Sequence, residues 1–411
     1  MIDNNSNNKG KKLVQINSVC NGSTGKIMGE IQKCATKSGY TCISFYGRRK
    51  GFKNLNSKKI NSEFFVYLHG ALTLLFNHHG RYSFFQTKRL VKKLRMINPD
   101  IIQLHNIHGY YLNYKVLFKY LKNEFNGKVF WTLHDCWPFT GHCAYFDYVQ
   151  CNKWQTCCKN CPQIKKYPVS LFFDTSKSEY VFKRNLFNDV KDLTIITPSK
   201  WLANLVAKSY LNNYNVKVIN NGIDLNIFKQ VIDSNVKIKY GIEEGKKIVL
   251  GVSNIWEDRK GLNDFIDMSS IISKNIQIVL VGLTEKQISK LPSNIIGITR
   301  TDNQEDLVKL YSIADVFVNP TKEDNYPTVN IESIACGTPV LTYDTGGCKE
   351  QIYKNTGFVC KNYSELVDKL EYCIENDYKH KTFDNSKIID KLDSNKCYEQ
   401  YIKLYNGSDK K

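Results

Sequence analysis

The order of apolar runs constrains the fold of this chain more than any other feature. Short runs rich in Val, Ile and Leu, such as residues 13–19 (LVQINSV) and 276–282 (IQIVLVG), alternate with longer amphipathic segments. Strand, loop and helix in repetition predict a parallel sheet with helices on both faces. In such a sheet, functional loops follow the carboxyl ends of strands.

The runs form two series separated by a polar stretch, and 411 residues suit two or three domains of about 150 residues each. We therefore predict an α/β protein with two doubly wound Rossmann-like domains. The final amphipathic segment could pack back on the N-terminal domain. The expected division is an N-terminal domain at 12–223, a linker and start of the second domain at 224–245, a C-terminal domain at 246–390 and a C-terminal helix at 391–411.

The net charge of +19 predicts attraction to polyanions. Five basic residues lie in the amphipathic segment 84–97 (FFQTKRLVKKLRMI), which suits either an anionic membrane surface or a domain helix with a solvated basic face. No DNA-recognition motif or aromatic RNA platform accompanies the charge, so we expect no nucleic-acid partner.

No apolar run is long enough to span a bilayer, and the polar N-terminus lacks the apolar core of a secretory signal. We therefore expect a cytoplasmic protein that could contact the inner face of the cell membrane.

Residues 319–348 combine acidic residues with the start of a helix. Pro327 suits a helix start, where its missing N–H costs nothing, and the free amides of that end attract a phosphate. Glu332, one to two turns further on, can accept two hydrogen bonds from a ribose diol. The alternative is an acidic loop before an ordinary buried helix.

Arg259 and Lys260 follow the first strand of the second series and precede Gly261. Cations at this position can neutralise the charge that grows on a diphosphate leaving group. A basic surface turn is the alternative.

In the first series, Gly22 and Gly25 (NGSTGK) follow the first strand and permit close approach of a ligand, although a plain turn is equally consistent. His105, Asn106 and His108 follow the strand DIIQ, where they could bind hydroxyls or transfer protons. A metal-binding histidine pair or local bonding to the backbone are the alternatives.

His134 and Asp135 follow the strand KVFWT. An aspartate beside an imidazole can hold the ring or compensate its charge. His134 is thus the best candidate for the reactive centre, with a structural histidine as the alternative.

Five cysteines lie close together at positions 143–161. In a reducing compartment such a cluster favours metal over disulfides. A structural zinc held by Cys143, Cys151, Cys158 and Cys161 is the leading interpretation, with free thiols, a disulfide or another metal as alternatives.

Taken together, these motifs resemble retaining glycosyltransferases of family 4, which have the two-domain GT-B fold. The resemblance runs through NGSTGK, TLHD, TPSKWL, VINNGID and DRKGL to the highly specific ADVFVNPTKEDNYPTVNIESIACGTPVLTYDTGGCKEQI. HNIHGYYLN and WPFTGHCAYFDYVQCNKW resemble a bacterial exopolysaccharide and colanic-acid-type subgroup.

The resemblance implies two domains facing each other across a cleft and transfer of a sugar, with retention, from a nucleotide diphosphate sugar, most simply a UDP- or GDP-sugar. The acceptor would be a glycan or a polyprenyl-linked oligosaccharide, in cell-surface polysaccharide biosynthesis, and no catalytic divalent metal is expected. Glu332 matches the glutamate that holds the ribose. Asp324 replaces the first family glutamate, which contacts the donor sugar, with Glu323 beside it.

The remaining implied roles follow the same motifs. His134 matches the histidine near the donor sugar, and Arg259 and Lys260 match the diphosphate-binding pair. Asn254 stands where many members carry an arginine. The other expected donor-binding residues are Gly22, Gly25, Tyr326, Pro327, Thr328, Gly346 and Gly347.

Two other classes of function remain open. One is a different enzyme on the same fold, such as a sugar-nucleotide epimerase or a phosphorylase. The other is a non-catalytic nucleotide-sugar or glycan-binding module.

Overall fold

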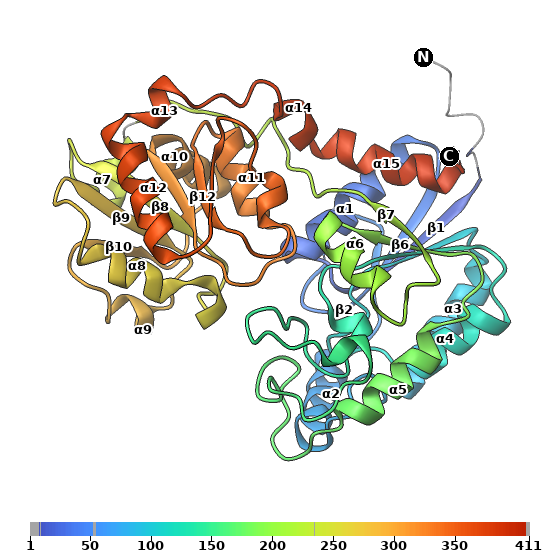
Figure 1. Cartoon of the computed structure of the whole chain (residues 1–411). Coiled ribbons are helices and arrows are strands. Elements are labelled where there is room, and N and C mark those ends of the chain that lie inside the picture. Colours follow the sequence, from blue (N-terminus) through green and yellow to red (C-terminus); the bar gives the residue numbers. More distant parts are fainter. Residues whose placement is uncertain (1–7, 9, 52–54, 234, 408–411) are drawn as a thin grey trace. The chain divides into compact units, whose positions relative to one another are not determined.

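The chain forms two compact units, each built on its own parallel sheet (Figure 1). The computed structural model describes residues 8, 10–51, 55–233 and 235–407. Unit 1 runs to Asn220 and includes the segment from Tyr398 onward, whereas unit 2 comprises Asn221–Cys397. The two doubly wound sheets confirm the predicted fold class.

The sheet of unit 1 has the strand order β3-β2-β1-β4-β5-β6-β7, and its paired strands are parallel. Its strands are β1 (Lys12–Val19), β2 (Thr41–Arg48), β3 (Ser57–Lys59), β4 (Ile101–Leu104), β5 (Lys128–Thr132), β6 (Leu193–Thr197) and β7 (Asn215–Val218). Its helices are α1 (Gly22–Lys37), α2 (Glu63–Phe76), α3 (Phe84–Ile97), α4 (Tyr114–Asn123), α5 (Ser176–Phe187) and α6 (Lys200–Ala207). The order reverses between β1 and β4, where such sheets bind ligands.

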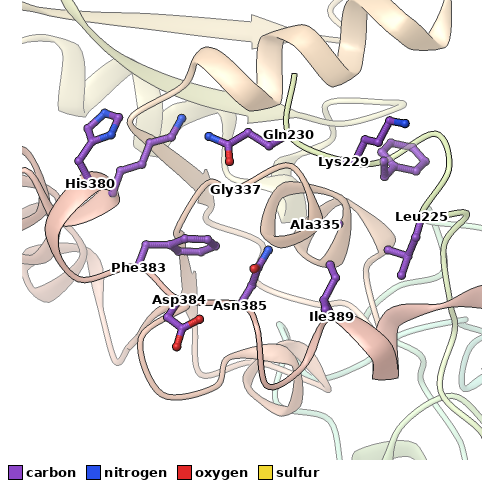
Figure 2. A pocket seen from close by; sticks show the side chains of 12 residues that line it. Leu225, Lys229, Gln230, Ala335, Gly337, His380, Phe383, Asp384, Asn385 and Ile389 are labelled. Carbon is purple, nitrogen blue, oxygen red and sulfur yellow. The ribbon is translucent and has the colours of Figure 1, made fainter. Parts of the chain in front are cut away.

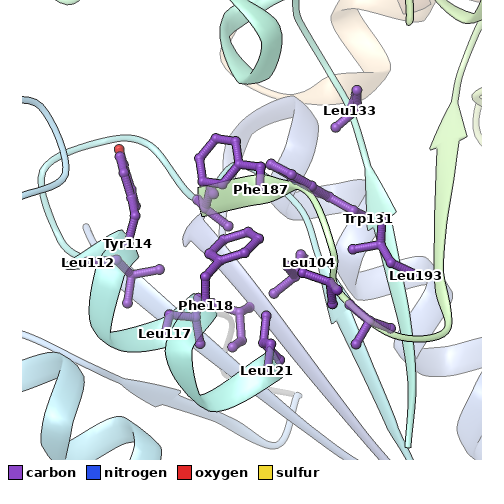
Figure 3. Packing of buried hydrophobic residues seen from close by; sticks show 14 of the residues in the cluster. Leu104, Leu112, Tyr114, Leu117, Phe118, Leu121, Trp131, Leu133, Phe187 and Leu193 are labelled. Atoms are coloured by element: carbon purple, nitrogen blue, oxygen red, sulfur yellow. The ribbon is translucent and has the colours of Figure 1, made fainter. Parts of the chain in front are cut away.

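Helices α4 and α5 enclose an aromatic core against the sheet of unit 1. Phe118 of α4 and Phe187 of α5 have ring centroids 4.6 Å apart, and Trp131 of β5 meets Phe187 edge to face at 5.1 Å (Figure 3). All three side chains are buried. Aromatic pairs in these geometries stabilise a core beyond the burial of their area.

Helix α15 (Ser394–Asn406) carries the chain from unit 2 back to unit 1. The hydroxyl of Tyr405 donates to Gln103 Oε1 of β4 at 3.0 Å, and the hydroxyls of Tyr401 and Thr132 lie 3.1 Å apart. Helix α15 therefore packs against the sheet of unit 1 through buried polar contacts.

Unit 2 repeats the architecture with the strand order β10-β9-β8-β11-β12-β13. Its strands are β8 (Lys247–Val252), β9 (Ile276–Val281), β10 (Ile295–Ile298), β11 (Val316–Asn319), β12 (Val340–Tyr343) and β13 (Gly357–Cys360). Its helices are α7 (Asn235–Tyr240), α8 (Leu262–Ser269), α9 (Glu285–Ile288), α10 (Gln304–Ile313), α11 (Thr328–Ala335), α12 (Tyr363–Glu375), α13 (Tyr378–Lys381) and α14 (Ile389–Leu392). Here the order reverses between β8 and β11.

Over the described ranges, no helix combines the length and apolar character needed to cross a bilayer.

Candidate functional site

The switch point of unit 2 is the edge of its sheet between β8 and β11, where the strand order reverses. Several of the cations and carboxylates singled out in the sequence lie there. Arg259 and Lys260 lie in the short 3-10 turn η3 (Asp258–Lys260) after β8, and Asp324 lies in the loop after β11. These neighbouring strands are parallel, so their carboxyl ends open on the same edge of the sheet. Residues far apart in sequence thus meet there.

The ammonium of Lys260 is ion paired with the carboxylate of Asp324, and the Arg259 guanidinium donates to the Glu323 carbonyl at 3.0 Å. Burial alone would raise the pKa of Asp324, but Lys260 and Arg259 hold that pKa below its usual value. The carboxylate therefore stays ionised and fixes the position of the lysine.

Helix α11 begins at Thr328, directly after Pro327, as the sequence predicts. Beneath its first turn, Asn319 donates to Asn330 at 2.8 Å, Asn330 donates to Gln351 at 2.9 Å, and Gln351 donates to the Pro327 carbonyl at 2.9 Å. This amide chain joins β11, α11 and η4 (Cys348–Gln351). It holds the anion-attracting end of the helix in place.

Glu332 lies on the second turn of α11, where Tyr311 of α10 donates its hydroxyl to Oε2 at 3.1 Å. Tyr311 is fully buried, and burial raises its pKa well above the usual value. The tyrosine therefore remains a hydrogen-bond donor and orients the carboxylate. No sequence motif pointed to Tyr311.

The glycine pair packs against the backbone of Asp324. Gly347 donates its N–H to the Asp324 carbonyl at 3.2 Å. At Gly346, φ is +54° and a Cβ atom would lie 1.8 Å from that same carbonyl oxygen. Glycine at 346 is thus required for the loop that carries Asp324 to adopt this path.

The other donor-side candidates occupy varied positions around this loop. Tyr326 is buried, and its carbonyl accepts from Asn221 at 3.3 Å. Thr328 is half-buried as the first residue of α11, whereas Asn254 is exposed after β8.

A cavity of about 430 Å³ lies elsewhere in unit 2, at the opposite end of α11 (Figure 2). Ala335, Gly337, Lys379 and Asn385 are among its lining residues. The Lys379 ammonium already donates to the carbonyls of Ser312 and Ala314. This cavity contains none of the residues that the sequence singled out.

At the switch point of unit 1, Gly22 and Gly25 lie in the first turn of α1 rather than in a free loop. Gly22 has φ +73°, and a Cβ atom at Gly25 would lie 2.3 Å from the carbonyl carbon of Cys20. The glycines therefore let the helix start tightly against the end of β1.

His105 and His134 stack at the ends of β4 and β5, with Nδ1 of His105 and Nε2 of His134 3.2 Å apart. Nε2 of His105 also meets Gln15 Oε1 of β1 at 3.1 Å. Burial lowers the pKa of His134 to about 4 and that of His105 well below its usual value. Both rings are therefore neutral at pH 7. Gln15 carries no motif and was not expected here.

Asp135 holds the imidazole of His108, whereas the sequence suggested its neighbour His134 as the partner. Oδ2 of Asp135 meets Nε2 of His108 at 3.0 Å, and Oδ1 accepts from the Trp137 backbone at 3.0 Å. The hydroxyl of Tyr167 lies 2.9 Å from Nδ1 of the same ring. The reason is geometric, because successive residues leaving β5 point in different directions while His108 arrives from β4.

His105 and His108 thus have separate partners rather than sharing a site. The carbonyl of half-buried Asn106 accepts from Tyr111 at 2.9 Å. The two histidines bond to different side chains, so neither a shared metal site nor bonding to the backbone alone describes their contacts.

The cysteine segment follows η1 (Trp137–Phe139) and includes η2 (Lys153–Gln155). A small cavity of about 10 Å³ is lined by the four predicted ligands Cys143, Cys151, Cys158 and Cys161, together with His142 and others. The Gly141 N–H donates to the Cys158 sulfur at 3.1 Å, and a hydrogen bond with Cys143 lowers the pKa of Cys161. No three of these sulfurs lie within 4.8 Å of one another, so shared binding of one ion requires them to draw closer.

Among the described residues, one group of three possible metal ligands lies close together, formed by Asp315, Asp377 and His380. Lys247 lies between the two carboxylates, 3.0 Å from Asp315 and 3.1 Å from Asp377. An ion-pair network accounts for this group.

Comparison with known proteins agrees with the fold and with the motifs. Residues 33–227 match the family described as Glycosyltransferase Family 4, and residues 233–388 match Glycosyl transferases group 1.

Among curated proteins, the chain is similar to the putative colanic acid biosynthesis glycosyl transferase WcaC of Escherichia coli. The two are 26% identical over 293 residues, which cover 70% of each chain. It is also similar to an N,N'-diacetylbacillosaminyl-diphospho-undecaprenol alpha-1,3-N-acetylgalactosaminyltransferase of Campylobacter jejuni, 26% identical over 39% of this chain and 45% of that protein.

Among solved structures, HepE of Anabaena in complex with UDP and glucose superposes with a TM-score of 0.66 at 17% identity. The match covers 97% of this chain and 100% of that chain. The fold is therefore GT-B, and the chain belongs to glycosyltransferase family 4.

Proposed function

We propose that this enzyme transfers a sugar, with retention, from a UDP- or GDP-sugar to a glycan or polyprenyl-linked acceptor in cell-surface polysaccharide biosynthesis. The observation that carries the proposal is the Lys260–Asp324 pair beside the start of α11. The similarity to a colanic acid enzyme and to an undecaprenol-dependent enzyme supports the acceptor class. The UDP complex of a protein with the same fold supports the donor class.

In this scheme unit 2 binds the donor. Glu332, whose carboxylate is oriented by the Tyr311 hydroxyl, accepts hydrogen bonds from the ribose. Lys260, Arg259 and the amides at the start of α11 bind the diphosphate, supported by Gly346 and Gly347. Asp324, with Glu323, orders the ammonium of Lys260 and contacts the sugar. The surrounding donor contacts come from Asn254, Tyr326, Pro327 and Thr328.

The bond between the anomeric carbon and the diphosphate oxygen breaks as the acceptor oxygen attacks from the same face. The acceptor hydroxyl proton passes to the departing phosphate oxygen, so no protein base is needed, and the direct attack of the acceptor needs no protein nucleophile. Lys260 and Arg259 stabilise the negative charge that develops on the diphosphate, which is the kind of electrostatic assistance that supplies much of enzymatic rate acceleration.

The histidines of unit 1 complete the proposal. His134, neutral because its pKa is about 4, offers a hydrogen bond to the donor sugar rather than a positive charge. Its stacked partner His105 fixes the ring. Asn106 and His108 are proposed to bind the acceptor, and Gly22 and Gly25 permit close approach at the start of α1.

We place the enzyme in the cytoplasm, in peripheral contact with the inner face of the membrane.

We also propose a structural zinc at Cys143, Cys151, Cys158 and Cys161. Support comes from their shared cavity and from the N–H that Gly141 donates to the Cys158 sulfur. Burial raises the pKa of Cys158 to about 12, and the Gly141 N–H and the buried ammonium of Lys183 oppose that rise only in part. Zinc thiolates carry net negative charge, which a neighbouring cation offsets.

The test is a donor screen in which purified protein, with an extract of lipid-linked oligosaccharides as acceptor, releases nucleoside diphosphate from one UDP- or GDP-sugar. Lys260→Ala and Glu332→Ala should each lower the release by about 100-fold or more. Lys274→Ala, at an exposed lysine of the same unit, is the matched control. Full activity in both site variants contradicts the assignment. Turnover without any acceptor favours an epimerase instead, and turnover that requires inorganic phosphate favours a phosphorylase.

A further inference from the structure

The burial pattern of helix α2 is the reverse of that of an ordinary surface helix. Its buried face consists of Val66, His69 and Thr73. Its large apolar side chains face outward, with Phe64 68% and Tyr67 74% exposed. A helix of a water-soluble domain normally buries such residues and exposes its polar ones.

The exposed apolar surface continues onto two neighbouring segments. The backbone of Leu171 donates to the Leu74 carbonyl at 2.9 Å, and Asn77 donates to the Phe173 carbonyl at 3.0 Å. These bonds hold the loop of Phe172, itself 72% exposed, against the end of α2.

On the other side, His69 of α2 meets the Ser83 hydroxyl at 2.8 Å, directly before α3. Phe85, at the start of α3, is 71% exposed. We call the whole surface the aromatic patch, and its exposed members are Phe64, Phe65, Tyr67, Leu68, Leu75, Phe76, Phe84, Phe85, Leu171, Phe172 and Phe173. Contiguous exposed apolar surface of this kind marks an interaction site.

The charges around the aromatic patch are mainly positive, and the exposed carboxylates Glu63 and Asp174 flank it. Residues 64–99 contain six Lys or Arg and no Asp or Glu, and the loop before Phe172 adds Lys165 and Lys166. The basic members of α3 point outward while Leu90, Val91 and Leu94 are buried, so α3 is a domain helix with a basic outer face. The Lys88 ammonium lies 4.5 Å from the Phe84 ring centroid.

Exposed aromatic rings beside basic side chains match the interface of an anionic bilayer, where the rings enter the headgroup region and the cations meet phosphates. A second copy of the chain fits less well, because two patches of like charge repel. With 14 residues, α2 spans about 21 Å, short of the roughly 30 Å hydrocarbon core, so it would lie along the interface.

We propose that the aromatic patch of unit 1 seats the enzyme on anionic phospholipid. The patch explains why α2 exposes its apolar residues and why α3 turns its cations outward. The inference extends the lipid-linked acceptor proposed above, but lipid binding is measured without donor or acceptor, so each can fail separately.

The experiment is flotation of the full chain with vesicles of phosphatidylcholine alone or with 30 mol% phosphatidylglycerol. We expect binding to the anionic vesicles at least tenfold above that to phosphatidylcholine, weakened at high salt because ions screen the cations. Phe64→Ser/Tyr67→Ser/Phe172→Ser should lower binding at least tenfold, and Lys88→Gln/Lys92→Gln should lower it severalfold.

Matched controls lie in unit 2. Ile232→Ser/Ile238→Ser/Ile271→Ser removes three comparably exposed apolar side chains, and Lys274→Gln/Lys286→Gln removes two exposed charges. Both should bind like the parent. Equal binding by the aromatic variant and the parent overturns the proposal. The proposal is also overturned if the parent and the control variants sediment as dimers and the aromatic variant sediments as a monomer. That result assigns the patch to contact with a second copy of the chain. Unchanged near-UV circular dichroism of the variants shows that the fold is intact.

Discussion

Lys260 and Asp324 are ion paired although 64 residues separate them, and their side chains are only 17% and 15% exposed. The pair joins the turn after β8 to the loop after β11 at the point where the strand order of unit 2 reverses.

Replacing Asp324 tests what this pair does. Asp324→Asn removes the charge that orders Lys260, so we expect kcat/KM for the nucleotide sugar to fall by about 100-fold. Asp324→Glu keeps the charge and should retain most activity. Steady-state kinetics check both, and equal losses in the two variants would show that side-chain length matters more than charge.

Tyr311→Phe removes the hydroxyl that orients Glu332. If Glu332 holds the ribose, KM for the donor should rise severalfold with little change in kcat, while stability falls by about 1 kcal/mol. Tyr343→Phe is a matched control, because the Tyr343 hydroxyl donates to the buried Asp264 carboxylate at 2.5 Å in the same unit. It should cost similar stability and leave KM unchanged. A rise in KM in both variants would trace the effect to general loosening.

Gly346→Ala should impair the donor loop, because its Cβ would collide with the Asp324 carbonyl oxygen. We expect loss of nucleoside diphosphate binding by at least tenfold in calorimetry. Gly245→Ala carries a similar backbone strain at φ +78° but meets nothing within 4 Å. That variant should bind normally, and normal binding by Gly346→Ala would disprove the packing argument.

Metal analysis of purified, reduced protein should find about one zinc per chain. Cys143→Ser and Cys158→Ser should each abolish it, whereas Cys157→Ser should not, because Cys157 does not line the cavity. Cobalt substitution should give the intense thiolate charge-transfer bands of a sulfur-rich site. Protein that carries no zinc and whose four thiols all react with a thiol reagent would rule the site out.

Stability should fall in mild acid. Burial lowers the pKa to about 3 for His69 and to about 4 for His134 and His142, whereas unfolded histidine titrates near 6.5. Above pH 6.5 both states are neutral. As the pH falls from 6.5 toward 4, only the unfolded state takes up protons, so the folded state loses about 1.4 kcal/mol per pH unit for each such group.

Urea unfolding at pH 7 and pH 5 measures this loss. His69→Gln should reduce the pH dependence of the unit 1 transition, and His380→Gln, at an exposed histidine, should leave it unchanged. An unchanged slope in His69→Gln would mean that this histidine is protonated in the folded protein.

The sequence was informative where a local pattern determines structure. Alternating apolar runs predicted both sheets, and Pro327 predicted where α11 begins. Contacts between distant segments were not predictable, because no local rule specifies which side chains meet. Two examples are the hydrogen bond between Asp135 and His108 and that between Tyr311 and Glu332.

Helix α2 shows a different limit. Its sequence is apolar on most sides, so periodicity alone does not tell which face is covered. Only the structure shows that His69 and Thr73 turn inward.

The amide chain of Asn319, Asn330 and Gln351 has a consequence for how this family member could diversify. Each amide donates to the next in one direction, so changing Asn330 or Gln351 leaves two partners unsatisfied in a buried place, and changing Asn319 leaves one. Substitutions among these three positions should therefore be inherited as a set. The residues facing the donor remain free to vary one at a time, so a new sugar preference could arise without rebuilding the framework that holds α11.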